Sequence, residues 1–86
     1  MKTILVLQSG FVFVGTLKAS LDDVARNNGS RVELSEAACI RRWGTTNGLG
    51  QLALSGPTKD TILDESGDVT APINAVILTM DCPGWK

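Results

Sequence analysis

Residues 2–19, KTILVLQSGFVFVGTLKA, decide the fold of this chain. Lys2–Leu7 is aliphatic and rich in β-branched side chains, which is typical of a strand that is buried on both faces or central in a sheet. Ser9 and Gly10 form a turn signal, and residues 11–19 follow with an excess of valine and phenylalanine. The stretch therefore predicts a β-hairpin.

Further short elements are predicted around this hairpin. Gly15, inside the second strand, indicates a bulge or the close approach of another backbone. One helical turn, capped by Ser20, is expected at residues 22–25. Composition predicts more extended segments at residues 31–34, 37–43, 58–63 and 69–80, with turns at 27–30, 35–36 and 64–68. Residues 75–80 are apolar apart from Thr79, so a central strand is expected there.

A short helix after residue 44 is the clearest local prediction. Leu49, Leu52 and Ala53 follow one another at i, i+3 and i+4, which places them on one helix face. Gly56 and Pro57 then supply a C-terminal glycine and a residue that cannot continue the helix. Side chains for the N-cap are offered by Thr45, Thr46 and Asn47.

Length and composition place these elements in a single domain, residues 1–86. A chain of 86 residues is long enough for one domain and no more, and 43% of its residues are hydrophobic. The predicted class is α+β, mostly β: a small antiparallel sheet or partly open barrel of about five to six strands with one short helix. The apolar composition also favours burial of surface against another copy, so a homo-oligomer is expected.

The N-terminus imitates a signal peptide but is better interpreted as a strand. Gln8 and Ser9 interrupt a very short apolar run, and no small-residue cleavage site follows. No stretch approaches the roughly 20 apolar residues of a membrane span, so no membrane partner is expected. Cys39 and Cys82 are expected to remain thiols in a reducing cytoplasm, with Cys39 a small buried residue rather than a nucleophile.

The charged-residue inventory argues against several functions. Eight basic and nine acidic residues give a net charge of −1, without the basic excess of a duplex-binding domain, so no nucleic-acid partner is expected. The chain has no histidine, the commonest general base and the usual zinc ligand. No metal, cofactor or catalytic residue is predicted, and the chain is not expected to be an enzyme. The acidic side chains of residues 60–68 lack calcium-loop spacing, so a solvated turn is the favoured interpretation.

Residues 41–51, RRWGTTNGLGQ, are the best candidate for a binding site. Arg41 and Arg42 supply forked donors suited to phosphate, and Trp43 offers a face on which a base can stack. The following loop enters a helix N-terminus, where free amides favour an anion. The predicted ligand-binding residues are Arg41, Arg42, Trp43, Thr45, Thr46, Asn47 and Gln51. The alternative is that Trp43 belongs to the core, the arginines to the surface, and that the loop only caps the helix.

The same segment resembles a family of short, functionally uncharacterised phage proteins. The resemblance is carried by Arg-Arg-Trp at 41–43, by the small-residue loop at 44–48 and by the helix at 49–54. It implies a viral origin and expression in the cytoplasm of a bacterial host cell. By analogy with small viral sponges, the expected function is to sequester a nucleotide-derived signal, either of the cyclic ADP-ribose type or a cyclic dinucleotide, between the subunits of a homo-oligomer and so counter host defence. The alternatives are a protein–protein interaction module that inhibits or assists a host or phage protein, and a small hydrolase that uses carboxylates.

Overall fold

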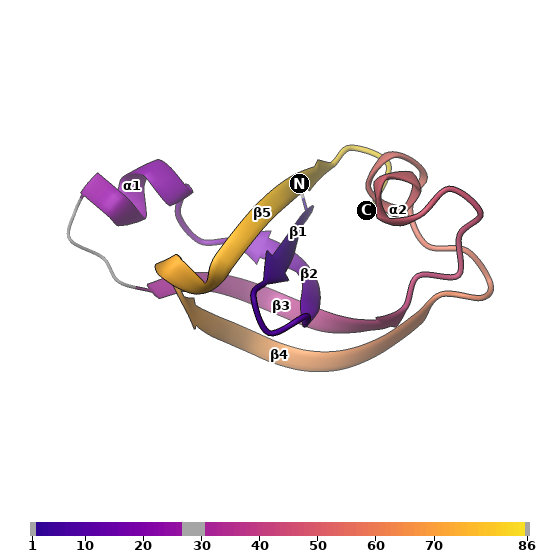
Figure 1. Cartoon of the computed structure of the whole chain (residues 1–86), viewed down its shortest axis with the longest axis horizontal. Helices are drawn as coiled ribbons and strands as arrows, with labels where there is room; N and C mark the ends of the chain where they lie inside the picture. The colour runs from indigo at the N-terminus through magenta and orange to yellow at the C-terminus, as the bar shows by residue number, and fades with distance from the viewer. Residues whose placement is uncertain (1, 27–30, 86) are drawn as a thin grey trace.

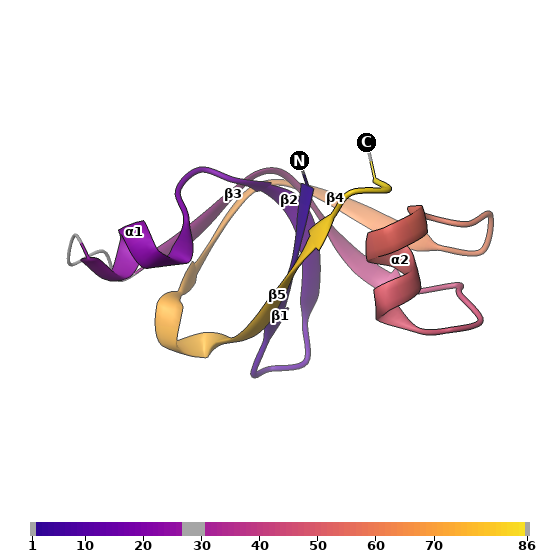
Figure 2. The ribbon, with the colours of Figure 1, turned by 90° about the horizontal axis from the view of Figure 1, so that it is seen from above.

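The computed structural model describes residues 2–26 and 31–85. Its strands form one five-stranded antiparallel sheet in the order β4-β3-β2-β1-β5 (Figures 1 and 2). They are β1 (Lys2–Leu7), β2 (Val12–Leu17), β3 (Arg31–Arg42), β4 (Ile62–Pro72) and β5 (Val76–Cys82). The connections in this part of the chain contain two short helices and a 3-10 turn: α1 (Leu21–Arg26), α2 (Leu49–Ser55) and η1 (Ile73–Ala75). The mostly β, α+β class is thus confirmed, in the form of an open sheet.

The predicted N-terminal hairpin lies in the middle of this sheet. Strands β1 and β2 pair antiparallel, with Ile4 opposite Val14 and Leu5 opposite Phe13, and β5 pairs with the other side of β1. Ile4 and Leu5 point to opposite faces because successive side chains alternate along a strand, and both are fully buried. The prediction of a strand buried on both faces is therefore confirmed.

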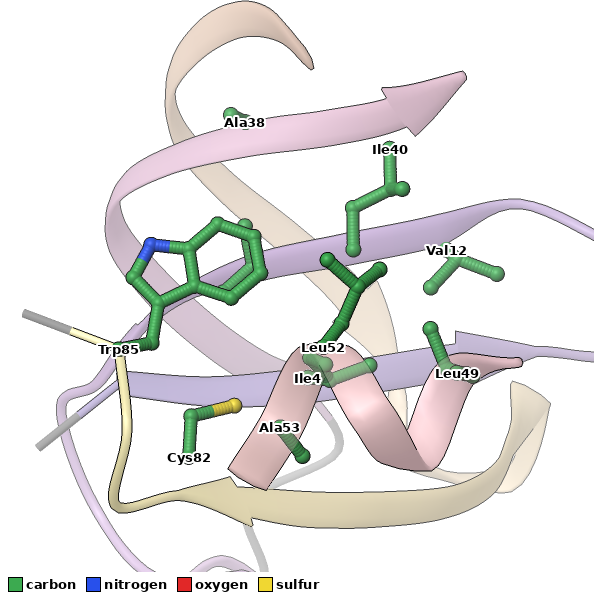
Figure 3. Packing of buried hydrophobic residues seen from close by; sticks show 10 residues of the cluster. Ile4, Val12, Ala38, Ile40, Leu49, Leu52, Ala53, Cys82 and Trp85 are labelled. Atoms are coloured by element: carbon green, nitrogen blue, oxygen red, sulfur yellow. The ribbon is translucent and has the colours of Figure 1, made fainter. Parts of the chain in front are cut away.

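Each face of the sheet carries its own hydrophobic core. The α2 core lies between the sheet and α2 (Figure 3). Its buried members are Ile4, Val12, Val14, Ala38, Ile40, Leu49, Leu52, Ala53, Cys82 and Trp85. The opposite core contains buried Leu5, Val32, Leu34 and Ala37 and is extended by Ile73 of η1. Buried side chains therefore lie on both faces of the sheet.

A bulge at Glu36 lets the long strand β3 contribute to both cores. Glu36 has a φ of 49°, and the pairing of β3 with β2 shifts register beside it. Leu34, before the bulge, enters the opposite core, whereas Ala38, after it, enters the α2 core. Gly15 lies across from the bulge, where a Cβ atom would come within 3.0 Å of the Ser35 carbonyl oxygen. This is the close backbone approach that a glycine inside the second strand predicted.

Two expectations for the C-terminal half are wrong. Residues 64–68 are not a turn but lie within β4, where Gly67, with a φ of 71°, sits at a register shift opposite Ala37. Strand β5, expected to be central, is an edge strand with β1 as its neighbour, and Ile77 is 58% exposed. Apolar composition does not separate central from edge strands here, because strand order is set by long-range pairing.

The ends of the helices follow the sequence only in part. At the start of α1 the Ser20 hydroxyl oxygen accepts the backbone N–H of Asp23 at 3.1 Å, which confirms the predicted cap. Gly56 ends α2 with a φ of 81°, and its N–H donates to the Leu52 carbonyl oxygen at 2.8 Å, as expected. The expected side-chain N-cap of α2 is wrong. Its N-cap is Gly48, without a side-chain hydrogen bond, because the preceding polar groups bond elsewhere in the loop.

The C-terminal tail closes the α2 core. Trp85 follows β5, is only 7% exposed, and directs its benzo ring toward Leu52 (Figure 3). The backbone N–H of Gly84 donates to the carbonyl oxygen of Ala53 at 3.3 Å, which ties the tail to α2. Helix α2 and the tail therefore cover the same part of the sheet.

The predicted turn at residues 27–30 lies outside the described residues. No helix in the described part of the chain is long and apolar enough to cross a membrane.

Candidate functional site

Residues 41–51 lead from the end of β3 into α2, where the sequence predicts a ligand. Trp43, directly after β3, is 42% exposed and belongs to neither core. The alternative that places this indole in the core is therefore wrong. The ring lies beside the loop, because a Cβ atom on Gly48 would stand 3.7 Å from its Cζ3 atom. An aromatic surface is thus accessible at the predicted position.

The backbone that carries Trp43 is held by the turn before β4. Thr61 Oγ1 donates to the carbonyl oxygen of Trp43, and Thr58 Oγ1 to that of Gly44, both at 2.6 Å. Gly44 has a φ of 66°, and a Cβ atom there would collide with the backbone of Asp60. Trp43 is therefore exposed on a fixed support. The sequence does not predict a role for either threonine, because only the pairing of β3 with β4 brings them to this position.

The loop between β3 and α2 uses its polar groups internally. Thr45 Oγ1 donates to the Gly48 carbonyl oxygen at 2.7 Å. Gln51 Oε1 lies 2.9 Å from the backbone nitrogen of Asn47 and 3.2 Å from the hydroxyl oxygen of Thr46, and accepts from both. The backbone N–H of Asn47, which the sequence predicts to bind an anion, therefore donates to the carboxamide of Gln51 instead. These hydrogen bonds together shape the loop that lies beside the indole.

The two predicted guanidiniums have different surroundings. Arg41 Nε lies 2.9 Å from Asp64 Oδ2, and both side chains are more than half exposed, so this ion pair contributes little to stability. Arg42 is exposed and forms no ion pair with any described residue. Lys59, on the turn that supports Gly44, is likewise exposed and unpaired within residues 2–26 and 31–85. Arg42 is thus the predicted cation that an anionic ligand can reach, and Lys59 adds a charge that the sequence did not single out.

The acidic residues of β4 do not converge on one point. Asp68 lies 3.5 Å from the Lys18 ammonium and accepts the backbone N–H of Glu36 at 3.3 Å, whereas Asp64 pairs with Arg41. In the part of the chain that the structure describes, no group of three His, Cys, Asp or Glu side chains is placed to hold a metal ion. The carboxylates of this run serve the bulge and an ion pair instead.

The two thiols are free and differ in burial. Cys39 is half-buried, whereas Cys82 is buried in the α2 core. Burial raises the pKa of the Cys82 thiol above its ordinary value of 9.0, since an ionised sulfur is poorly solvated there. Cys82 therefore stays protonated and packs as a small apolar side chain.

A hollow of about 570 Å³ opens where β3 and β4 bulge. Its lining comes from β1, β2, β3, β4 and the tail, and includes Lys2, Val14, Glu36, Leu63, Glu65 and Trp85. A volume of this size is in the range of small-molecule sites. Nothing in the sequence indicates it, because its walls are brought together from segments far apart in the chain.

No protein-family model matches the chain, and it has no significant match among curated proteins or solved structures. Function therefore has to be inferred from the chain's own residues.

Proposed function

We propose that this chain is a non-enzymatic binding protein that holds a small nucleotide-derived molecule against Trp43 and Arg42. The observation that carries the proposal is the exposed indole of Trp43 on a rigid support. Stacking of a base on an aromatic ring is worth about 1–3 kcal/mol. A guanidinium binds phosphate through two parallel hydrogen bonds. In the proposal, Trp43 stacks on the base and Arg42 binds the phosphate of one nucleotide.

The fixed backbone around Trp43 supports this function energetically. A ligand that binds a preformed surface does not have to order a loop, and this saves the entropy that ordering would cost. Thr58 and Thr61 hold the carbonyl groups of residues 43 and 44, and Gln51 holds the following turn. In this proposal Thr45, Thr46, Asn47 and Gln51 are positioning residues, and Trp43 and Arg42 contact the ligand.

A second copy of the chain is part of the proposal, because one chain offers the ligand only an open surface. Ile62 is exposed and lies opposite Arg42 in the pairing of β3 with β4, so an exposed apolar side chain stands next to this arginine. Burial of this surface between copies would exclude water from the phosphate contacts and strengthen them. We expect size-exclusion chromatography to find an oligomer. In biological terms, the proposal is that the chain comes from a phage and sequesters a nucleotide immune signal in the host cytoplasm.

A thermal-shift measurement with cyclic ADP-ribose and cyclic di-GMP tests this function. A ligand present at about 100 times its Kd should raise the free energy of unfolding by about 2.7 kcal/mol. Chromatography after denaturation should recover the nucleotide unchanged, which separates binding from hydrolysis by carboxylates. Failure of both nucleotides to raise the unfolding temperature would contradict the proposal.

The variant Trp43→Ala tests the site itself. Loss of stacking should weaken nucleotide binding about 10- to 100-fold, as measured by calorimetry. Phe11→Ala is the matched control, because Phe11 is an exposed aromatic residue at the turn between β1 and β2. Arg42→Ala should weaken binding more than Arg41→Ala, since Arg41 already pairs with Asp64. Equal affinities of Trp43→Ala and the unmodified chain would place the ligand elsewhere.

Protein docking is a second candidate function, favoured by the position of β5 at the edge of the sheet. No strand of the described residues pairs with its outer side, and Ile77 and Leu78 are exposed. An extended segment of another protein can add a strand to such an edge. Leu78→Lys would then abolish capture of the partner in a pull-down experiment and leave nucleotide binding at Trp43 unchanged.

A further inference from the structure

The hollow beside Trp85 has the features of a binding site separate from the Trp43 surface. It measures about 570 Å³, which is within the range of pockets for small ligands. Val14 of β2 and Leu63 of β4 contribute apolar wall, and the tail closes one side. A ligand here would contact the bulged part of the sheet and not the loop at residues 44–48.

Trp85 lines this hollow and carries a hydrogen-bond donor that no described residue uses. Its side chain is more than nine-tenths buried, with the benzo ring directed at Leu52 and the pyrrole nitrogen on the other edge (Figure 3). No acceptor within the described residues bonds its Nε1–H. Every fully enclosed side-chain nitrogen or oxygen in the described part of the chain has a hydrogen-bond partner. The Trp85 Nε1 atom has no such partner, so it is not fully enclosed and a ligand can reach its N–H. Buried indoles usually find an acceptor, and a ligand in the hollow would supply one.

Three charged side chains surround the same hollow without ion pairs. Lys2, Glu36 and Glu65 line it, and none of them has an oppositely charged partner within residues 2–26 and 31–85. Glu36 is placed there by the bulge of β3, and Glu65 by its pairing with Ala38. Charges of both signs around one hollow complement a ligand that carries both signs.

We propose that this hollow binds a small zwitterion. Its ammonium group would lie against Glu36 and Glu65, and its carboxylate would accept hydrogen bonds from Lys2 and from the Trp85 Nε1–H. An unblocked dipeptide with aliphatic side chains has these groups together with an apolar part for the wall. The site is independent of the nucleotide proposal, because it uses the other tryptophan and other strands.

Two-dimensional ¹H–¹⁵N NMR of the full chain with leucyl-leucine tests this site. Each of the two tryptophans contributes one indole N–H signal, and Trp43→Phe assigns them by removing the Trp43 signal. The dipeptide should shift the Trp85 signal and leave the Trp43 signal in place, whereas a nucleotide should do the reverse. No shift of the Trp85 signal at about ten times a weak Kd of about 1 mM would overturn the zwitterion site, whatever the nucleotide result.

A blocked dipeptide and a charge-neutral variant test the ammonium contact. N-acetylated leucyl-leucine lacks the ammonium group and should bind about tenfold or more weakly. Glu65→Gln should weaken the unblocked dipeptide by about tenfold and leave the acetylated one unchanged. Glu33→Gln is the control, because Glu33 pairs with Lys18 and does not line the hollow. Equal binding of the blocked and unblocked dipeptides would overturn the proposal.

Discussion

Trp43 and Trp85 each follow a strand and stand next to a glycine, yet their environments are opposite. Trp43 is 42% exposed, whereas Trp85 is 7% exposed and fills the α2 core. The backbone at Trp43 is held by two threonine hydroxyls, but its ring belongs to neither core of the described residues. The tail at Trp85 folds back onto α2, and this contact carries the indole into the core. Holding the backbone and burying the side chain are therefore separate events, and only burial supplies hydrophobic stability.

Replacement of each tryptophan by alanine gives the largest expected contrast. Trp85→Ala should lower the free energy of unfolding by about 3–5 kcal/mol, because it empties part of the α2 core. Trp43→Ala should change it by about 0.5 kcal/mol or less, as is usual for surface positions. Urea denaturation followed by circular dichroism measures both changes. Similar losses in the two variants would contradict the difference in burial.

The glycine beside Trp85 gives the next largest effect. In Gly84→Ala the new Cβ atom would collide with the carbonyl oxygen of Leu54, so the tail has to move away from α2. Overpacking of this kind should cost about 1–3 kcal/mol. Gly50→Ala is the matched control: a Cβ atom there meets nothing within 4 Å, and alanine in a helix should stabilise by up to about 1 kcal/mol.

The same urea denaturation series measures both glycine variants. A Gly84→Ala variant as stable as the unmodified chain would mean that the tail does not pack against α2. The contact between the tail and α2, which buries Trp85 and has no counterpart at Trp43, would then be absent.

The pH dependence of stability gives the smallest effect and probes the core beside Trp85. Burial raises the pKa of Cys82, so the unfolded chain releases this proton first as the pH rises above about 9.0. The unfolded state then binds fewer protons, and the free energy of unfolding should fall as the pH increases through this range. Cys82→Ala should reduce this dependence in denaturation curves measured between about pH 8 and pH 10. An unchanged slope would mean that the thiol is solvated in the folded chain.

Prediction from the sequence succeeds here where neighbours along the chain decide the conformation. The bonds at Ser20 and Gly56 involve residues within one or two helical turns, and the hairpin of β1 and β2 needs only a short turn. It fails where distant segments compete for the same groups. Gln51 takes the loop amide expected to bind an anion, and β4 continues through a run whose composition resembles a turn. The sequence does not decide whether Trp43 is buried or exposed, since burial depends on elements that are remote in sequence.

Residue type and spacing alone determined the mostly β class, the central buried hairpin and the short helix ending at Gly56, because hydrophobic periodicity and turn chemistry act over a few residues. Tertiary structure alone decided that Trp85 fills the core, that β5 lies at the edge, and that a hollow opens at the bulges of β3 and β4. The physical reason is that burial and strand order depend on contacts between segments that approach one another only after the sheet has formed.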